Sequence, residues 1–241
     1  ALEHGLMVMG PDCGTAIIDG VPLGFANVVR RGPIGIVGAS GTGTQQVTCL
    51  VHRYGEGISQ AIGTGGRDLR TEVGGMTMLQ ALNALARDAA TKVIVLVSKP
   101  PAPEVAARVL AAARKARKPV VVNFVGGARA AITGANLHFA GTLDEAARAA
   151  VALARGRAPA RRSATRVSPR LLATVPRLAA TQRYVRGLYS GGTFCYEASA
   201  LLGAALGEVR SNAPVDPRMH LADVWRSVGH TVVDLGDDDF T

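Results

Sequence analysis

Two short, unbroken apolar runs constrain the fold of this chain most strongly. They are KVIVLVS (residues 92–98) and PVVVNFV (residues 119–125). A strand that is apolar at successive positions has both faces covered, which is typical of a parallel sheet flanked by helices. Amphipathic helical stripes precede and follow these runs, so the sequence predicts alternating strands and helices.

The predicted elements of the first 156 residues fit one open, parallel sheet. Strands are expected at residues 34–37, 58–62, 92–98, 119–125 and 137–140, and helices at residues 44–54, 76–85, 103–117 and 142–156. Thr142 is the expected cap of the last helix and Gly156 its stop. We therefore predict an α/β fold with about five strands and helices on both faces.

Residues 155–182 read as a connector, because they are rich in Ala, Pro, Ser and Thr and follow no sustained period. No acid lies between Glu145 and Glu197, and ten arginines in that gap account for the formal charge of +9. Few aromatic residues accompany them, which favours a solvated basic linker over a nucleic-acid-binding arm. Docking of the linker onto an acidic partner subunit stays open.

Beyond the connector, an earlier pattern returns. GIVGASGTGTQQVTCLV (residues 35–51) predicts a strand, a turn of Gly, Ser and Thr, and a helix, and RGLYSGGTFCYEASALL (residues 186–202) repeats this succession. VGHTVVDLGDDDFT (residues 228–241) repeats the second strand and its turn. We predict an internal duplication with an incomplete second copy of two strands. Both ends look cut, so the chain is expected to be a portion of a larger protein.

The turn before each helix is a candidate anion site. A helix begins with unpaired N–H groups and a partial positive charge, glycine lets a ligand approach, and the hydroxyls of Ser40, Thr42 and Thr44 offer further donors. Phosphate is the favoured occupant, although neither a Walker lysine nor GxGxxG is present. In the alternative, Ser40 or Thr42 only caps a tight turn. If the two helix starts faced each other, they would concentrate positive potential on one site.

Other candidate residues follow strand ends. Arg67 could bind a carboxylate or phosphate, or could pair with Asp68 to brace its loop. Lys99 could point into the same crevice or into solvent. Cys13, beside Asp12, lacks a nearby histidine to activate it, which favours a structural turn over a nucleophile.

Composition excludes several classes of protein. Hydrophobic residues make up 48% of the chain, yet no apolar run reaches the roughly 18 residues of a membrane helix. Three cysteines without a CxxC spacing favour a soluble, cytoplasmic protein. His138 and His230 have no metal-ligand companions and are expected to pack or face solvent, and a GDDDF stretch reads as a charged strand end, so no metal site is predicted.

Several motifs together resemble the succinyl-CoA synthetase superfamily. Three stretches are similar to turns of its α subunit: MGPDCGTAI (residues 9–17), GIVGASGTGTQQV (35–47) and IGTGGRD (62–68). Three others are similar to its FdrA branch: KPPAPEV (99–105), RGLYSGGTFCYEA (186–198) and HTVVDLGDDDFT (230–241). The resemblance implies a flavodoxin-like, three-layer α/β/α ligase domain at residues 32–156. It also implies the end of a CoA-binding-like domain at 1–31, a linker at 157–182, and the start of a second ligase domain at 183–241.

The resemblance also implies functional residues. Two helix entrances would bind phosphate, formed by Ser40, Gly41, Thr42, Gly43 and Thr44 and by Ser190, Gly191, Gly192 and Thr193. The superfamily's Gly-His-Ala loop is missing, because no histidine follows the fourth strand before His138. Lys99 replaces its acidic partner. A phosphohistidine cycle would therefore lack its central intermediate; CoA or a nucleotide is implied as a ligand, with neither certain.

The resemblance to FdrA proteins implies a function in ureide and purine degradation. It also implies partner subunits, in a homo- or hetero-oligomer. The expected activity is carbamoyl transfer to or from oxamate through carbamoyl phosphate, with Arg67 or Lys99 orienting the oxamate carboxylate. The alternatives are an ADP- or GDP-forming acyl-CoA synthetase whose nucleophile comes from elsewhere, and a non-catalytic scaffold whose basic linker recruits partners.

Overall fold

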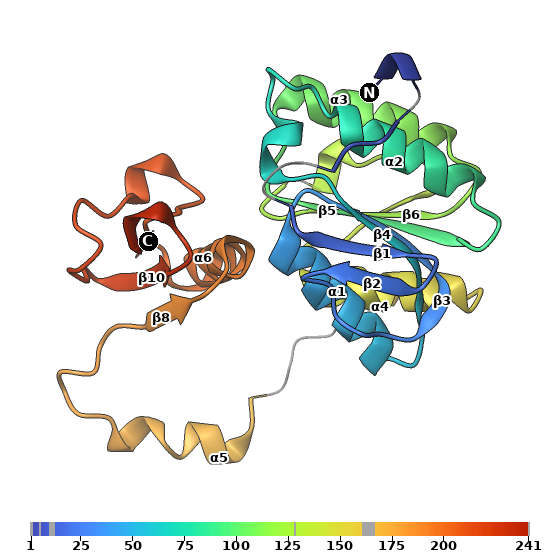
Figure 1. The fold of residues 1–241 in the computed structure, drawn as a ribbon. Coiled ribbons are helices and arrows are strands. Elements are labelled where there is room, and N and C mark those ends of the chain that lie inside the picture. Colours follow the sequence, from blue (N-terminus) through green and yellow to red (C-terminus); the bar gives the residue numbers. More distant parts are fainter. Residues whose placement is uncertain (1, 5, 10–12, 128, 161–166, 241) are drawn as a thin grey trace. The chain divides into compact units, whose positions relative to one another are not determined.

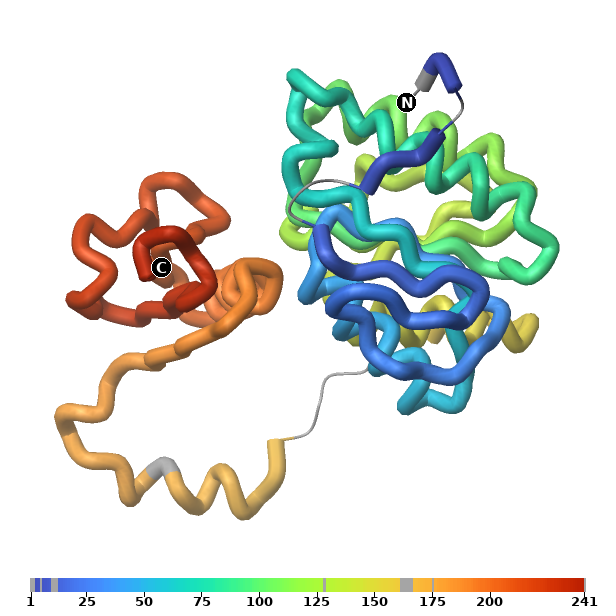
Figure 2. Tube along the Cα trace, viewed as in Figure 1, coloured from blue at the N-terminus to red at the C-terminus, as the bar shows by residue number. Residues whose placement is uncertain are grey.

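The computed structural model describes residues 2–4, 6–9, 13–127, 129–160 and 167–240. The chain divides into two compact units, Ala1–Pro159 and Ala160–Thr241, which we describe separately (Figures 1 and 2). The strands of unit 1 are β1 Thr15–Ile18, β2 Val21–Gly24, β3 Arg31–Gly38, β4 Ile58–Gly63, β5 Val93–Ser98, β6 Val120–Phe124 and β7 Leu137–Phe139. Its α-helices are α1 Gly41–Arg53, α2 Met76–Arg87, α3 Pro103–Lys115 and α4 Leu143–Ala154.

One seven-stranded sheet organises unit 1, with strand order β2-β1-β4-β3-β5-β6-β7. The strands from β3 to β7 pair in parallel, whereas β1 pairs antiparallel with both β2 and β4. The predicted α/β fold with a parallel sheet and flanking helices is confirmed. The chain passes from β3 to β4 on one side and then crosses to β5 on the other. This is the switch point where such sheets usually bind ligands, outside the carboxyl ends of the strands.

Helices cover both faces of this sheet. α2 and α3 lie over one face and α1 and α4 over the other (Figure 1). All six residues of β5 are buried, as its unbroken apolar run predicts. Leu82 of α2 and Val109 of α3 pack with Leu96 of β5 in one core cluster, and each is at most 1% exposed. Burying one such side chain contributes about 1.5–3 kcal/mol, so this core fixes the strand ends that carry the candidate site.

A hairpin that the sequence analysis missed extends the sheet. Strands β1 and β2 are joined by Asp19 and Gly20, whose φ angles are 49° and 80°. Two successive residues with positive φ form the tight turn that suits a two-residue hairpin, and an Asp-Gly pair is its usual signal. Residues 1–31 were expected to end a separate domain, but this hairpin continues the sheet of unit 1.

Helix boundaries follow local capping. The predicted helix at residues 44–54 begins three residues earlier, at Gly41, because Ser40 caps it. The predicted Thr142 cap of α4 is confirmed, since its hydroxyl accepts a hydrogen bond from the Glu145 amide at 3.1 Å. The helix α3 ends at Lys115, two residues before the predicted end.

Unit 2 contains a smaller parallel sheet of order β8-β10-β9. Its elements are β8 Arg186–Tyr189, α6 Gly192–Leu206, β9 Val209–Arg210, and β10 His230–Asp234. β8, α6 and β10 repeat the arrangement of β3, α1 and β4, because β10 pairs in parallel with β8 as β4 does with β3. The predicted second copy had two strands; the short β9 is a third, inserted between α6 and β10.

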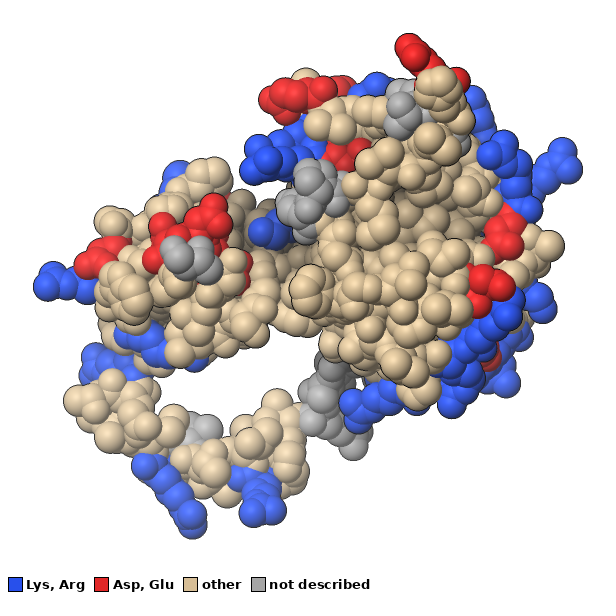
Figure 3. Space-filling model, in the orientation of Figure 1, with Lys and Arg blue, Asp and Glu red and all other residues tan. Residues whose placement is uncertain are grey.

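The predicted connector contains a short helix, α5 Pro169–Leu172. Arg170 and Arg177 of this segment are exposed, and Figure 3 shows basic side chains projecting from it. Residues 161–166 of the predicted connector lie outside the described residues. Among the helices that the structure describes, none has the length and apolar character needed to cross a membrane.

Candidate functional site

The start of α1 stands at the carboxyl ends of β3 and β4. Gly38 and Gly63 are the last residues of these strands and are partners in register. A Cβ on Gly38 would lie 1.8 Å from Thr44 Oγ1, and a Cβ on Gly63 would lie 1.9 Å from Cys13 Sγ. Neither position has room for a side chain, so Gly38 lets α1 begin directly above the sheet edge and Gly63 leaves space for Cys13.

Two predicted ligand hydroxyls are used within the helix start itself. Ser40 Oγ accepts a hydrogen bond from the Gly43 amide at 2.9 Å, and Thr44 Oγ1 donates to the Ser40 carbonyl at 2.6 Å. Ser40 is 8% exposed and Thr44 is fully buried. The capping role that the sequence analysis left open for Ser40 is therefore present. Of the five entrance residues, Gly41 and Thr42 are the half-buried ones that reach solvent.

The β1–β2 hairpin supports this entrance from one side. Gln45 Nε2 donates to the Phe25 carbonyl at 2.6 Å and lies 3.4 Å from Thr15 Oγ1. Cys13 is 7% exposed and packs against Gly63, which fits the structural reading of that turn. Asp12 lies outside the described residues.

Arg67 and Asp68 do not form the ion pair that one interpretation of the sequence suggested for this loop. Asp68 is 5% exposed, and its carboxylate accepts hydrogen bonds from the amides of Thr77 at 3.0 Å and Met78 at 2.8 Å. These amides open α2, so Asp68 caps a helix instead of pairing with Arg67. Arg67 itself is exposed, in the single turn η2 Gly66–Leu69.

Arg67 and Lys99 approach the same sheet edge from two sides. Arg67 follows β4, Lys99 follows β5, and β3 with the α1 entrance lies between these strands. Both side chains are exposed. The strand order therefore puts one basic residue on each flank of the entrance.

Buried polar atoms at this edge escaped the sequence analysis. Ser98 ends β5 and is 1% exposed, and Asn123 in β6 is fully buried. The Asn123 amide group donates to the Ala140 carbonyl at 3.0 Å, but its Oδ1 and the Ser98 Oγ have no partner among the described atoms. A polar residue at the end of the first apolar run and another inside the second were the available signals. Such unsatisfied atoms are rare in folded proteins and mark the edge as a candidate ligand site.

The second entrance has different surroundings. Gly191 precedes α6 without a side-chain cap, Thr193 is 4% exposed, and Ser190 is exposed. Asp234 pairs in register with Tyr189, just as Gly63 pairs with Gly38. This buried carboxylate stands where unit 1 has a glycine and makes a second anion less favourable there. The entrances belong to separate units, so their facing one another stays a prediction.

His138 and His230 lie in strands of the two units. His138 lies in β7, where burial lowers its pKa. His230 Nδ1 accepts a hydrogen bond from the Val185 amide at 3.1 Å, and its ring meets Tyr184 edge-on. No group of three potential metal ligands occurs within the described parts of the chain.

Comparison with known proteins places this geometry in context. Residues 29–127 match the family model described as a CoA binding domain. The match lies mostly within the region assigned above to a ligase domain, residues 32–156. The uncharacterized protein YahF of Escherichia coli K12 is 48% identical over the whole chain, which covers 47% of that protein. The α subunit of the ADP-forming succinate–CoA ligase of Aquifex aeolicus is 32% identical over 95 residues, 38% of this chain and 30% of that subunit.

Over part of its length, the chain is therefore similar to a CoA binding domain and to a succinate–CoA ligase α subunit. The chain spans less than half the length of the curated relatives it matches. Two solved structures share the fold. One is the dinucleotide-forming acetyl-coenzyme A synthetase 1 of Ca. Korarchaeum cryptofilum, with a TM-score of 0.50 and 20% identity over 85% of this chain and 44% of that one. The other is the ATP citrate lyase of Methanothrix soehngenii, with a TM-score of 0.51 and 18% identity over 76% of this chain and 37% of that one.

Proposed function

We propose that this chain is part of a CoA-ligase-like enzyme of the FdrA type that binds an acyl phosphate at the α1 entrance. The observation that carries the proposal is the entrance itself. Gly38 lets α1 begin against the sheet edge, and Gly41 and Thr42 reach solvent between strand ends that carry Arg67 and Lys99. A helix N-terminus flanked by cations suits a small phosphate-bearing substrate.

Carbamoyl phosphate is the acyl phosphate that we propose. With oxalurate and phosphate as substrates, a phosphate oxygen attacks the carbamoyl carbon and the bond from that carbon to the oxamate nitrogen breaks. The nitrogen takes up a proton, so oxamate and carbamoyl phosphate leave. Backbone amides at Gly41 and Thr42 would hold the phosphate, and Arg67 or Lys99 would orient the oxamate carboxylate.

The position of His138 supports transfer without a phosphohistidine. It is the first histidine after β6, and it lies in β7 in register with Val121 instead of in the preceding loop. Burial lowers its pKa, which disfavours the protonated ring but does not by itself activate it. Partner subunits would supply whatever residues this chain lacks.

A second candidate is an acyl-CoA synthetase role, favoured by the match of residues 29–127 to a CoA binding domain. In that case CoA or a nucleotide would use the same entrance, and the nucleophile that stores phosphate would come from another subunit. Both candidates need the α1 entrance, but they differ in the substrate that consumes the phosphate.

The deciding experiment measures two reactions on the same preparation of the longer protein with its partner subunits. Phosphate-dependent formation of carbamoyl phosphate from oxalurate supports carbamoyl transfer. CoA-dependent release of ADP from ATP supports the synthetase instead. If neither reaction is observed in a preparation whose fold is intact by circular dichroism, the proposal is contradicted. Thr42→Asp serves as the matched variant, since it places a carboxylate at the entrance.

A further inference from the structure

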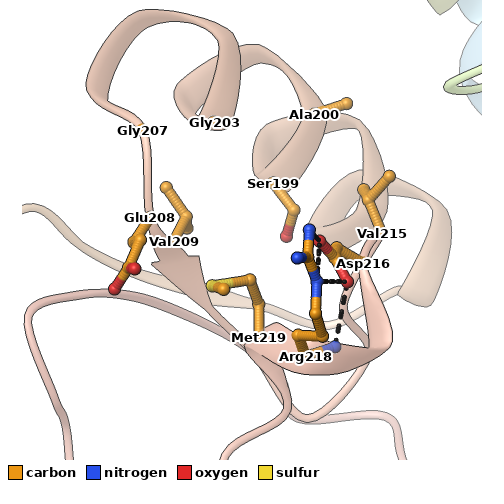
Figure 4. Close-up of a pocket in the computed structure, with 10 residues that line it drawn as sticks. All are labelled: Ser199, Ala200, Gly203, Gly207, Glu208, Val209, Val215, Asp216, Arg218 and Met219. Atoms are coloured by element: carbon orange, nitrogen blue, oxygen red, sulfur yellow. Dashed lines mark hydrogen bonds and ion pairs between the residues drawn. The ribbon is translucent and has the colours of Figure 1, made fainter.

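A cavity of about 490 Å³ lies wholly within unit 2 (Figure 4). One face of α6 forms its first wall, and the segments 207–209 and 215–219 form the others. The volume falls in the range of small-molecule pockets. The cavity is separate from the α1 entrance, which belongs to unit 1, so what it binds is a question independent of the proposed function.

Ser199 gives this cavity an unused hydrogen-bonding group. Its side chain projects from α6 into the space bordered by Met219 and Arg218 (Figure 4). Ser199 is 6% exposed, and its Oγ has no partner among the described atoms. Thr48, the corresponding eighth residue of α1, is also buried but donates its hydroxyl hydrogen to the Gln45 carbonyl at 2.7 Å. A hydroxyl at this helix position can therefore donate to the carbonyl three residues earlier, but the Ser199 hydroxyl does not.

Gly203 lines the cavity. It is the twelfth residue of α6, and a Cβ built there meets nothing within 4 Å. The twelfth residue of α1 is His52, whose imidazole Nδ1 accepts a hydrogen bond from the Arg30 amide at 2.9 Å. A glycine inside a helix is unfavourable unless something needs the space. Gly203 therefore leaves its part of the cavity wall without a side chain.

The lining favours an uncharged ligand. Ala200, Val209, Val215 and Met219 provide apolar contact, and a methionine sulfur packs well against a ring edge. Arg218, the cation of the lining, is engaged by Asp216, with Nη2 to Oδ2 at 2.7 Å. Glu208 stands exposed at the rim, with Arg210 4.0 Å away. An anion would meet two carboxylates and a guanidinium that is already paired.

We propose that this pocket binds an uncharged, flat nitrogen heterocycle, for which a purine nucleoside is a suitable probe. The ring would pack on Met219 and over Gly203, and Ser199 Oγ would donate to or accept from a ring nitrogen. The carboxylate of Glu208 at the rim would accept hydrogen bonds from ligand donors. The pocket would reject phosphate-bearing compounds, in contrast to the α1 entrance.

Adenosine is the test ligand, titrated into the intact chain and followed by saturation-transfer NMR. We expect saturable binding in the sub-millimolar range, and at least a tenfold loss in Gly203→Leu, which fills the space. Leucine has a higher helix propensity than glycine, so the variant is expected to fold, and circular dichroism and the melting temperature check this. Ser199→Ala is expected to weaken binding several-fold, while Thr42→Asp in unit 1 leaves it unchanged.

Three results would overturn the proposal. They are the absence of saturable adenosine binding at millimolar concentration, equal affinity in wild type and Gly203→Leu, and tighter binding of AMP than of adenosine. Failure of this test would leave the α1 entrance untouched, because Thr42→Asp reports on that site alone.

Discussion

Gly38 and Gly63 face each other in register at the carboxyl ends of β3 and β4, and each is pressed by a side chain from a neighbouring segment. Thr44 occupies the space beside Gly38, and Cys13 occupies the space beside Gly63. The α1 entrance therefore depends on two missing side chains as much as on the residues that are present. Its geometry can be tested without any ligand.

Gly38→Ala should destabilise unit 1 by about 1–3 kcal/mol, because the new methyl group would overlap the Thr44 hydroxyl. Gly41→Ala is the matched control in the same turn, since its Cβ would meet only Thr15 Oγ1 at an ordinary 3.5 Å. Urea unfolding followed by circular dichroism measures both variants. Equal midpoints for the two would contradict the close packing described here.

Asp68→Ala should cost about 1.5–3 kcal/mol of stability for each charge-assisted hydrogen bond lost at the start of α2. The amides of Thr77 and Met78 lose their acceptor, and water has limited access to replace it. Arg67→Ala is the control next door. Because Arg67 is exposed, its removal should change stability by no more than about 0.5 kcal/mol. A large effect of Arg67→Ala on unfolding would show that we have misassigned the two residues.

Thr42→Asp should separate folding from function at the entrance. A carboxylate in the first turn of a helix is stabilising by about 0.3–1 kcal/mol, so the melting temperature should hold or rise. The same charge repels a bound phosphate, so phosphate affinity should fall at least tenfold, as measured by isothermal titration. Thr42→Asn keeps the size without the charge and should retain most of the affinity. Equal phosphate binding by Asp and Asn variants would argue against an anion at this entrance.

Periodicity in the sequence was enough to find the parallel sheet, because β5 and β6 are apolar at nearly every position. It was not enough for the β1–β2 hairpin. That element is exposed on one side and short, and its Asp19-Gly20 turn was the clearest available signal. Local capping by Ser40 moved the start of α1 to a position that the apolar spacing could not reveal.

The candidate site could be predicted only in part, because side-chain partners depend on tertiary contacts. The entrance and its flanking Arg67 and Lys99 follow from the strand order. The hydrogen bond from the Thr44 hydroxyl to the Ser40 carbonyl forms only once the helix start has folded. The hydrogen bonds by which Asp68 caps α2 join residues nine and ten positions apart in the sequence. The cavity at Gly203 is further from prediction still, since a glycine inside an apolar helix looks like a minor defect in the sequence.

The remaining prediction concerns pH. Burial lowers the pKa of His138 below the ordinary value of 6.5, so the unfolded chain binds a proton there more readily than the folded one. The stabilising effect of a neutral His138 is therefore fully present above about pH 6.5 and is lost as pH falls through its folded pKa. In His138→Gln, the difference in unfolding free energy between pH 8 and pH 5 should shrink.

Asp88 affects stability in a separate pH range. Its pKa is lowered chiefly by its hydrogen bond from Thr91, so the stability that its carboxylate contributes is lost only below the ordinary pKa of 3.8. Urea melts at pH 8, 6.5 and 5 distinguish the two, and an unchanged pH dependence in His138→Gln would exclude this residue as the source.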